Sequence, residues 1–270
     1  FAGLTDNATG TASIAASSFS GGIYTFDVTD TAAEGPVTFT ATESVLTKSG
    51  TSAGVTWSPD VIASFSVVAS PGSLSAGENT TITITAKDTN GNTITTYDNT
   101  ADIDLTQSGG TGGSITWSGT GVTDLGTGSG TLAGGNFSNG VAVVYVNDTV
   151  AEGPITFTVT ENDSGLSRTG TSGGVTWSPG ALAYYTLTPD TTSPTAGNAS
   201  SITIRAYDSY NNQITTYNNA NQVDITQSGG TGGAGSPISY AAGGGFAGLT
   251  DNATGTASIA ASSFSGGIYT

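Results

Sequence analysis

An internal repeat constrains this chain more than any other feature. Residues 1–25 and 246–270 carry the identical string FAGLTDNATGTASIAASSFSGGIYT, shifted by 245 residues. A diverged copy lies inside this period, because TSAGVTWSP at 51–59 returns as TSGGVTWSP at 171–179, which is 120 residues later. The sequence therefore alternates modules of 120 and 125 residues, which is typical of a tandem array rather than of one globular domain.

The shift of 120 residues also preserves the apolar positions. Intervening positions drift between Thr, Ser, Asn and Asp, as a solvated face allows. This pattern indicates one shared core that is constrained only by packing. The matched pairs are Phe65 and Tyr185, Val67 and Leu187, Ile82 and Ile202, Ile84 and Ile204, Ile94 and Ile214, Tyr97 and Tyr217, Ile103 and Val223, and Leu105 and Ile225.

Within a module the apolar residues alternate with a period of two. In TITITA at 81–86, Ile82, Ile84 and Ala86 fall on one face and the threonines on the other, as expected of a half-buried β-strand. Similar runs at 63–68, 102–106, 141–146 and 154–160 are separated by turn signals, which favours about seven short strands per module. Nearly half of the residues are Gly (41), Pro (8), Thr (49) or Ser (33). The predicted fold class is all-β, with antiparallel β-sandwich modules of immunoglobulin type in tandem.

Two blocks resemble the immunoglobulin-like surface repeats of bacteria and archaea, including those of the invasin and intimin adhesins. They are VVASPGSLSAGENTTITITAKDTNGNTITTY at 67–97, with its degenerate copy at 187–217, and TLAGGNFSNGVAVVYV at 131–146. The resemblance covers nearly the whole chain and implies an elongated array of such modules. It also implies that the first block forms two early strands followed by a tight Asp-x-x-Gly-Asn hairpin. The motif says almost nothing about ligands.

The Pro of each TWSP string is the expected module boundary. On this basis 1–60 is the C-terminal part of a module, 61–180 is a complete module and 181–270 is the N-terminal part of another. Residues 26–60 would complete the third segment, so we expect the chain to be a window from a longer covalent array. Strand exchange between separate chains is the alternative, but 246–270 would then compete with the identical N-terminal segment of the next copy.

Four residues mark the predicted junctions: Trp57, Pro59, Trp177 and Pro179. Almost no spacer follows them, so neighbouring modules should touch directly. Proline restricts the backbone, and a Trp at a boundary can bury a large area between modules. The alternative is that each Trp lies in the core of its own module.

Composition excludes several functions. Twenty acidic residues stand against four basic ones, which gives a net charge of −16 and argues against a nucleic-acid partner. Cys, His and Met are absent, so there is no disulfide framework, thiolate or imidazole metal site, or His-dependent catalytic triad. No stretch reaches the roughly 20 apolar residues of a membrane span.

Calcium is the one candidate ligand. Asp88, Asn90 and Asn92 place oxygens at alternate positions around Gly91, and hard cations prefer several oxygen ligands. Asp98, Asp102 and Asp104 follow a few residues later, and Asp27, Asp30 and Glu34 are acids on the side of the junction. The alternative is a type I′ hairpin with solvated carboxylates. The other module has DSYNN (Asp208, Asn211, Asn212), which loses the alternation.

Other chemistry is weakly indicated. Glu34 with Glu43, and Glu152 with Glu161, flank a strand of about eight residues, roughly 25 Å long, so neither pair can converge as glycoside hydrolysis requires. We therefore predict no enzyme. Weaker alternatives are an isopeptide bond at Lys87, an ice-binding threonine ladder and a carbohydrate platform around Tyr207, Tyr210 and Tyr217.

The sequence thus predicts a non-catalytic structural subunit of an extracellular filament, stalk or sheath, whose partners are copies of itself. Identical surfaces at regular intervals suit assembly into a polymer. The alternative is a spacer in a large monomeric cell-surface adhesin.

Overall fold

The structure is a computed structural model that describes residues 3–163, 166–234 and 236–270. Every helix or strand assigned in these ranges is a β-strand. The chain divides into two compact units, residues 1–62 with 87–94, and residues 63–86 with 95–270. Nothing in the described ranges forms a helix with the length and apolar character that crossing a bilayer would require.

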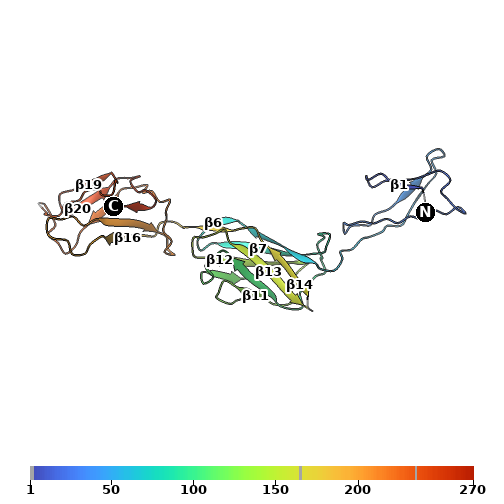
Figure 1. The fold of residues 1–270 in the computed structure, drawn as a ribbon, viewed down its shortest axis with the longest axis horizontal. Coiled ribbons are helices and arrows are strands. Elements are labelled where there is room, and N and C mark those ends of the chain that lie inside the picture. Colours follow the sequence, from blue (N-terminus) through green and yellow to red (C-terminus); the bar gives the residue numbers. More distant parts are fainter. Residues whose placement is uncertain (1–2, 164–165, 235) are drawn as a thin grey trace. The chain divides into compact units, whose positions relative to one another are not determined.

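The strands between Ser64 and Ser178 form a β-sandwich (Figure 1). One sheet has the order β5-β7-β12-β9 and the other has the order β10-β11-β8-β13-β14. The strands are β5 (Ser64–Ser70), β6 (Ser73–Ser75), β7 (Asn79–Lys87), β8 (Ile103–Ser108), β9 (Ile115–Ser118), β10 (Val122–Asp124), β11 (Gly130–Leu132), β12 (Val141–Asp148), β13 (Thr156–Asp163), β14 (Leu166–Thr171) and β15 (Thr176–Ser178). In the first sheet β12 is antiparallel to β7 and β9, and in the second sheet every neighbouring pair is antiparallel, whereas β15 runs parallel to β6. The last strand of the module therefore returns to the side of its first strands.

The core of this sandwich comes from the alternating positions. β7 contributes Ile82, Ile84 and Ala86, all with no exposed surface, while its intervening threonines are half-buried. Further buried side chains from β5, β8, β12 and β13 are Phe65, Val67, Ile103, Leu105, Ala142, Val144, Val146, Phe157 and Val159. The predicted period-two strands and the all-β class of the fold are confirmed.

Residues 181–270 repeat part of this arrangement. Two sheets have the orders β16-β17-β21 and β18-β20-β19. Their strands are β16 (Tyr184–Pro189), β17 (Ile202–Tyr207), β18 (Val223–Thr226), β19 (Leu249–Asp251), β20 (Thr256–Ile259) and β21 (Ile268–Tyr269). The core contains Ile204, Ile259, Phe264 and Tyr269. β18 is the counterpart of β8, but it pairs only with β20 among the described strands, whereas β8 pairs with both β11 and β13.

Residues 1–60 form two hairpins, β1 (Leu4–Asp6) with β2 (Ala12–Ile14), and β3 (Thr40–Thr42) with β4 (Ser49–Thr51). The first hairpin has the register of β19 and β20, because Leu4 pairs with Ile14 as Leu249 pairs with Ile259. Burial nevertheless differs between these identical sequences. Phe19 is 59% exposed, whereas its counterpart Phe264 is 4% exposed. The local sequence therefore sets the hairpin, and its surroundings set the burial.

Candidate inter-module junction

A five-residue hairpin after β7 begins the junction between residues 1–60 and the following module. Asp88 N–H donates to Asn92 O at 3.1 Å, and Gly91 has a φ of 85°. The hairpin after β17 is its counterpart, with Asp208 N–H donating to Asn212 O at 3.0 Å. Asn211 occupies the position of Gly91 and also has a positive φ, of 68°. Gly and Asn are the residues that tolerate this conformation, so the two diverged sequences DTNGN and DSYNN build one turn.

The Asp88 carboxylate is saturated with hydrogen bonds. Its Oδ1 accepts from the N–H groups of Asn90 (2.9 Å) and Asn92 (2.8 Å). Its Oδ2 accepts from Asn92 Nδ2 (2.9 Å) and from the backbone N–H of Asp60 (3.1 Å). The side-chain bond from Asn92 is the main reason that the pKa of Asp88 lies below its ordinary value; burial opposes it, and the backbone bonds add to it. The carboxylate thus ties the hairpin to the residue that follows Pro59.

Asn92 also binds residues 31–33, which belong to the same compact unit as the hairpin. Its Nδ2 also donates to the carbonyl oxygen of Thr31 at 2.8 Å, and its Oδ1 accepts from the backbone N–H of Ala33 at 3.0 Å. One side-chain amide therefore pairs with both an acceptor and a donor of the same backbone segment. Such two-point pairing fixes direction as well as distance, much as one step of a β-ladder does.

The second junction repeats this geometry. Asn212 Nδ2 donates to Thr149 O at 2.9 Å, and Asn212 Oδ1 accepts from Ala151 N–H at 2.9 Å. Asp208 Oδ2 accepts from the N–H of Gly180 at 2.9 Å, which is the residue after Pro179. Burial of the Asp208 carboxyl raises its pKa, but the hydrogen bonds from Asn212, Gly180 and Tyr210 outweigh it, so the pKa lies below its ordinary value.

The two hairpins differ at three positions, and one of these differences changes a contact. Asn90 of the first hairpin is replaced by Tyr210 in the second. The Tyr210 ring lies against Gly77, where a Cβ atom would come within 2.3 Å of Tyr210 Cε2. Gly77 has a φ of 87° and belongs to module 61–180. Tyr210, considered from sequence as part of a carbohydrate platform, therefore packs against Gly77.

The predicted junction tryptophans have partners inside their own modules. Trp177 is buried; its ring lies edge-on to Phe157 with centroids 6.3 Å apart, and Nε1 donates to Glu78 O at 3.0 Å. Trp57 meets Phe39 in the same way at 6.2 Å. The geometry corresponds to the alternative interpretation, a core position. A contact between either ring and the neighbouring module stays a prediction.

Pro59 and Pro179 are half-buried, each one residue before the backbone N–H that is bound by Asp88 or Asp208.

The junction residues that sequence reasoning missed are the backbone partners Thr31, Ala33, Thr149 and Ala151. One signal pointed to them. Asn92 and Asn212 are both asparagine, although the position two residues before each has changed from Asn to Tyr.

The calcium hypothesis at Asp88, Asn90 and Asn92 stays a prediction. The side-chain oxygens of Asp88 and Asn92 already accept hydrogen bonds from N–H groups, as described above. Among the described residues no group of three or more Asp, Glu, His or Cys side chains is placed to hold a metal ion. A cation at this hairpin would therefore have to displace several hydrogen bonds.

The remaining candidates are spread apart. Glu152 accepts a hydrogen bond from Thr111 Oγ1 at 2.9 Å, whereas Glu161 pairs with Arg168 at 2.9 Å. The two carboxylates lie before and within β13 and have separate partners, so they do not form one site. Lys87 Nζ donates to Thr93 Oγ1 at 2.9 Å.

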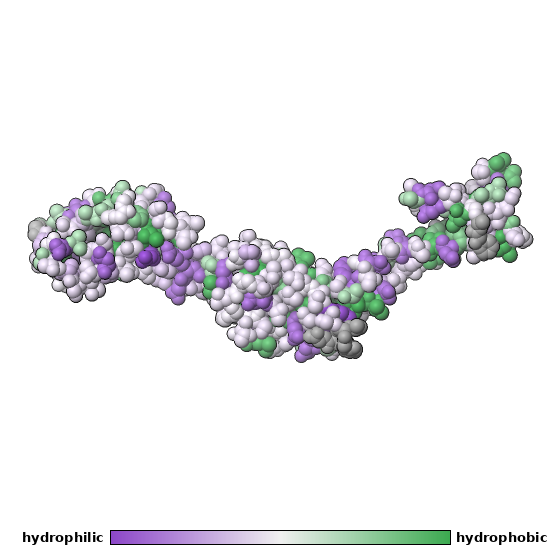
Figure 2. Space-filling model, viewed as in Figure 1, coloured by the Kyte–Doolittle hydropathy of each residue, from purple (hydrophilic) through white to green (hydrophobic). Residues whose placement is uncertain are grey.

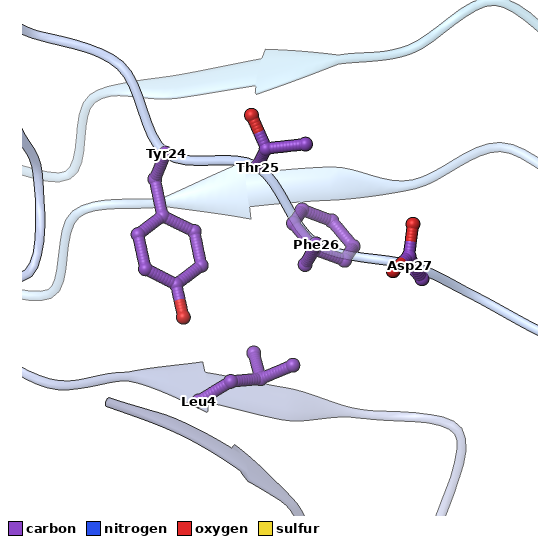
Figure 3. A pocket seen from close by; sticks show the side chains of 5 residues that line it. All are labelled: Leu4, Tyr24, Thr25, Phe26 and Asp27. Carbon is purple, nitrogen blue, oxygen red and sulfur yellow. The ribbon is translucent and has the colours of Figure 1, made fainter. Parts of the chain in front are cut away.

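A pocket in the N-terminal unit is lined by Leu4, Tyr24, Thr25, Phe26 and Asp27. Figure 3 shows the Tyr24 ring pointing toward Leu4 across it. The counterparts of Leu4 and Tyr24 are Leu249 and Tyr269, which pack together in the core of residues 181–270. The lining is therefore made of core positions of a module, and it does not resemble a site built to bind a ligand.

The comparisons with known proteins concern the fold. No protein-family model matches the chain, and no curated protein matches it. A structure of the Escherichia coli adhesin FdeC matches with a TM-score of 0.37 and 22% identity, covering 77% of this chain and 59% of that one.

Two further structures match at lower identity. Domains 1–6 of the surface layer protein SbsC match with a TM-score of 0.27 and 17% identity, covering 78% of this chain and 23% of that one. A type II cohesin dyad of the scaffoldin ScaA from Acetivibrio cellulolyticus has a TM-score of 0.26 and 13% identity, covering 75% and 78%. This chain spans less than two thirds of the matched FdeC and SbsC chains.

Proposed function

We propose that this chain is a structural repeat unit of an extracellular filament, stalk or sheath, without catalytic activity, whose modules are joined in tandem by the Asp–Asn hairpin. The observation that carries the proposal is the recurrence of one junction geometry. Asn92 and Asn212 each clamp a Thr carbonyl and an Ala N–H of the preceding module at 2.8–3.0 Å. A junction reproduced in two diverged modules is what a regularly spaced array requires.

The module boundaries of the proposal are residues 60 and 180. Residues 26–60 of one repeat would complete residues 181–270 of the preceding repeat in the same covalent chain. The strand register supports this assignment. Thr40 pairs with Thr51 in β3 and β4 as Thr158 pairs with Thr171 in β13 and β14. In the complete module β13 covers the edge of β8, so β3 would cover the corresponding edge of β18.

The surface suits packing against copies of the same chain. Figure 2 shows a visible face on which residues of intermediate hydropathy cover most of the area, with hydrophilic and hydrophobic patches between them. Only 9% of residues are charged, and few lysines are present to keep strand edges apart. Absence of Cys and Met fits long exposure to oxidants outside the cell. Identical surfaces then recur every 245 residues along the proposed polymer.

Two measurements on the native material test the proposal. Mass spectrometry of the intact polypeptide should give a chain longer than one 245-residue period by further repeats; a mass near 26.5 kDa would refute covalent continuity. Negative-stain microscopy and sedimentation should then show regular multi-chain filaments or sheets. Isolated beaded threads would instead support the spacer of a monomeric adhesin, which shares the fold but not the assembly.

A further inference from the structure

A buried carboxylate lies at the end of β12, next to the second junction. Asp148 has no exposed surface. Its Oδ1 accepts a hydrogen bond from Val150 N–H at 2.9 Å, whereas its Oδ2 is buried and no donor meets it in hydrogen-bonding geometry. Buried polar atoms are almost always paired, and an unpaired charged oxygen is especially costly. This oxygen therefore requires an explanation.

The groups beside Asp148 are also oxygen donors. The carboxylate of Glu152 and the hydroxyl of Ser114 are adjacent to it. Thr111 orients both of them, because its N–H and Oγ1 donate to Glu152 and its carbonyl accepts from Ser114 Oγ at 2.7 Å. Burial is the main reason that the pKa of Asp148 lies above its ordinary value. Interactions with Val150 N–H and the Ser114 hydroxyl oppose this rise, whereas the charge and the carboxyl group of Glu152 add to it.

The loop before β9 comes close enough to shape this site only because of a glycine. A Cβ atom at Gly110 would lie 2.6 Å from Ile155 Cδ1 and 3.0 Å from Glu152 Oε1. Gln107 stabilises the same loop, because its Oε1 accepts a hydrogen bond from Gly110 N–H at 3.0 Å. The QSGGTGG string thus folds tightly over the carboxylates and keeps them in place.

We propose that Asp148, Glu152 and Ser114 bind a divalent cation, with calcium as the preferred ion. The site offers two carboxylates and a hydroxyl, with Thr111 at its exposed rim, and calcium takes oxygen ligands of these kinds and completes its shell with water. Two of the four basic side chains bind other groups, Arg168 with Glu161 and Lys87 with Thr93. A bound cation supplies the missing partner of Asp148 Oδ2.

Both carboxylates recur in the other module, whereas Ser114 corresponds to Ala234 and a serine, Ser236, follows two residues later. Asp30 and Glu34 stand in DTAAEGP as Asp148 and Glu152 stand in DTVAEGP. Ser236 Oγ donates to Thr231 O at 2.7 Å, as Ser114 does to Thr111. Assembly of this second set from residues 30–34 and 231–236 rests on the proposed covalent array. The site at Asp148 does not, because all its ligands lie within one module.

The test is thermal unfolding and calorimetric titration of the full 270-residue chain with CaCl2 after treatment with a chelator. Calcium at about ten times its Kd should raise the midpoint of unfolding by about 3 °C or more. Asp148→Asn should abolish this response, and in chelator it should melt above the wild type, because a neutral amide replaces an unpaired buried charge. Glu152→Gln should weaken calcium binding by about tenfold or more.

Two control variants locate the ion. Asp124→Asn changes an exposed carboxylate on β10 and should keep the full calcium response. Asp88→Asn alters the hairpin that the sequence suggested and should also keep it. The proposal is overturned if calcium leaves the midpoint unchanged, if Asp148→Asn still responds, or if only Asp88→Asn loses the response. A wild type that ignores calcium but gains stability from pH 7 to pH 5 would show instead that Asp148 and Glu152 share a proton.

Discussion

The side-chain amide of Asn212 donates to the backbone carbonyl of Thr149 at 2.9 Å, across 63 residues of sequence. Its oxygen accepts from Ala151 N–H at the same distance, and Asn92 repeats the arrangement one module earlier. Asparagine alone among the short side chains carries a donor and an acceptor side by side, and so can pair with both groups of a backbone segment. A Leu or Asp at this position would lose one or both bonds.

Asn212→Ala should loosen the second junction. The substitution leaves Thr149 O and Ala151 N–H without their partner at a half-buried position, which costs about 1–3 kcal/mol. Urea unfolding should show this loss, and NMR relaxation should show residues 61–180 and 181–270 tumbling more independently. Asn218→Ala, at an exposed position of the same module, is the matched control and should change neither. Equal effects in both variants would mean that Asn212 has no special role.

Acid should weaken the junction through Asp208. Its pKa in the folded protein lies below the ordinary value of 3.8, so the folded state favours the ionised carboxylate. The corresponding stability is fully present above the unfolded pKa and is lost as the pH falls through the folded pKa. The stability difference between wild type and Asp208→Asn should therefore be constant from pH 7 to about pH 5 and shrink below pH 3.8. A difference that is unchanged down to pH 2 would contradict this account.

Trp177→Ala should destabilise module 61–180 by about 3–5 kcal/mol, because it empties a buried position and removes the donor to Glu78 O. Chemical denaturation followed by circular dichroism would measure it. Trp57→Ala provides the comparison, since Trp57 is only half-buried in the N-terminal unit, and its cost should be clearly smaller. Similar losses would show that burial within the module is not what Trp177 contributes.

Removing one partner of the ion pair between Glu161 and Arg168 should destabilise the protein strongly, whereas replacing both partners by apolar residues should change its stability little. Glu161 is buried, and Arg168 Nη1 donates to its Oε2 at 2.9 Å. Arg168→Ala leaves a buried carboxylate alone, so a loss of about 3–5 kcal/mol is expected, whereas Glu161→Leu with Arg168→Leu should be close to neutral. Urea unfolding of the three proteins distinguishes the cases; a double variant no better than Arg168→Ala would count against it.

Local patterns predicted much of the fold. The alternation of Ile82, Ile84 and Ala86 identified β7 and its buried face, and Phe157 and Val159 did the same for β13. The Asp88 hairpin was also predicted, because Gly91 is a residue that accepts a positive φ. These features depend on the backbone preferences and hydrophobicity of neighbouring residues, which the sequence carries directly.

Which residues far apart in the sequence contact one another was decided only by the tertiary structure. The sequence offered Asp88, Asn90 and Asn92 as ion ligands, because their spacing does not reveal that Asn92 meets Thr31. It also could not reveal that Asp148 Oδ2 is buried where no donor meets it in hydrogen-bonding geometry. Phe19 and Phe264 stand in identical 25-residue segments, yet one is exposed and the other buried. Burial depends on which strands surround a segment, so identical residues acquire different environments while their hairpins keep the same register.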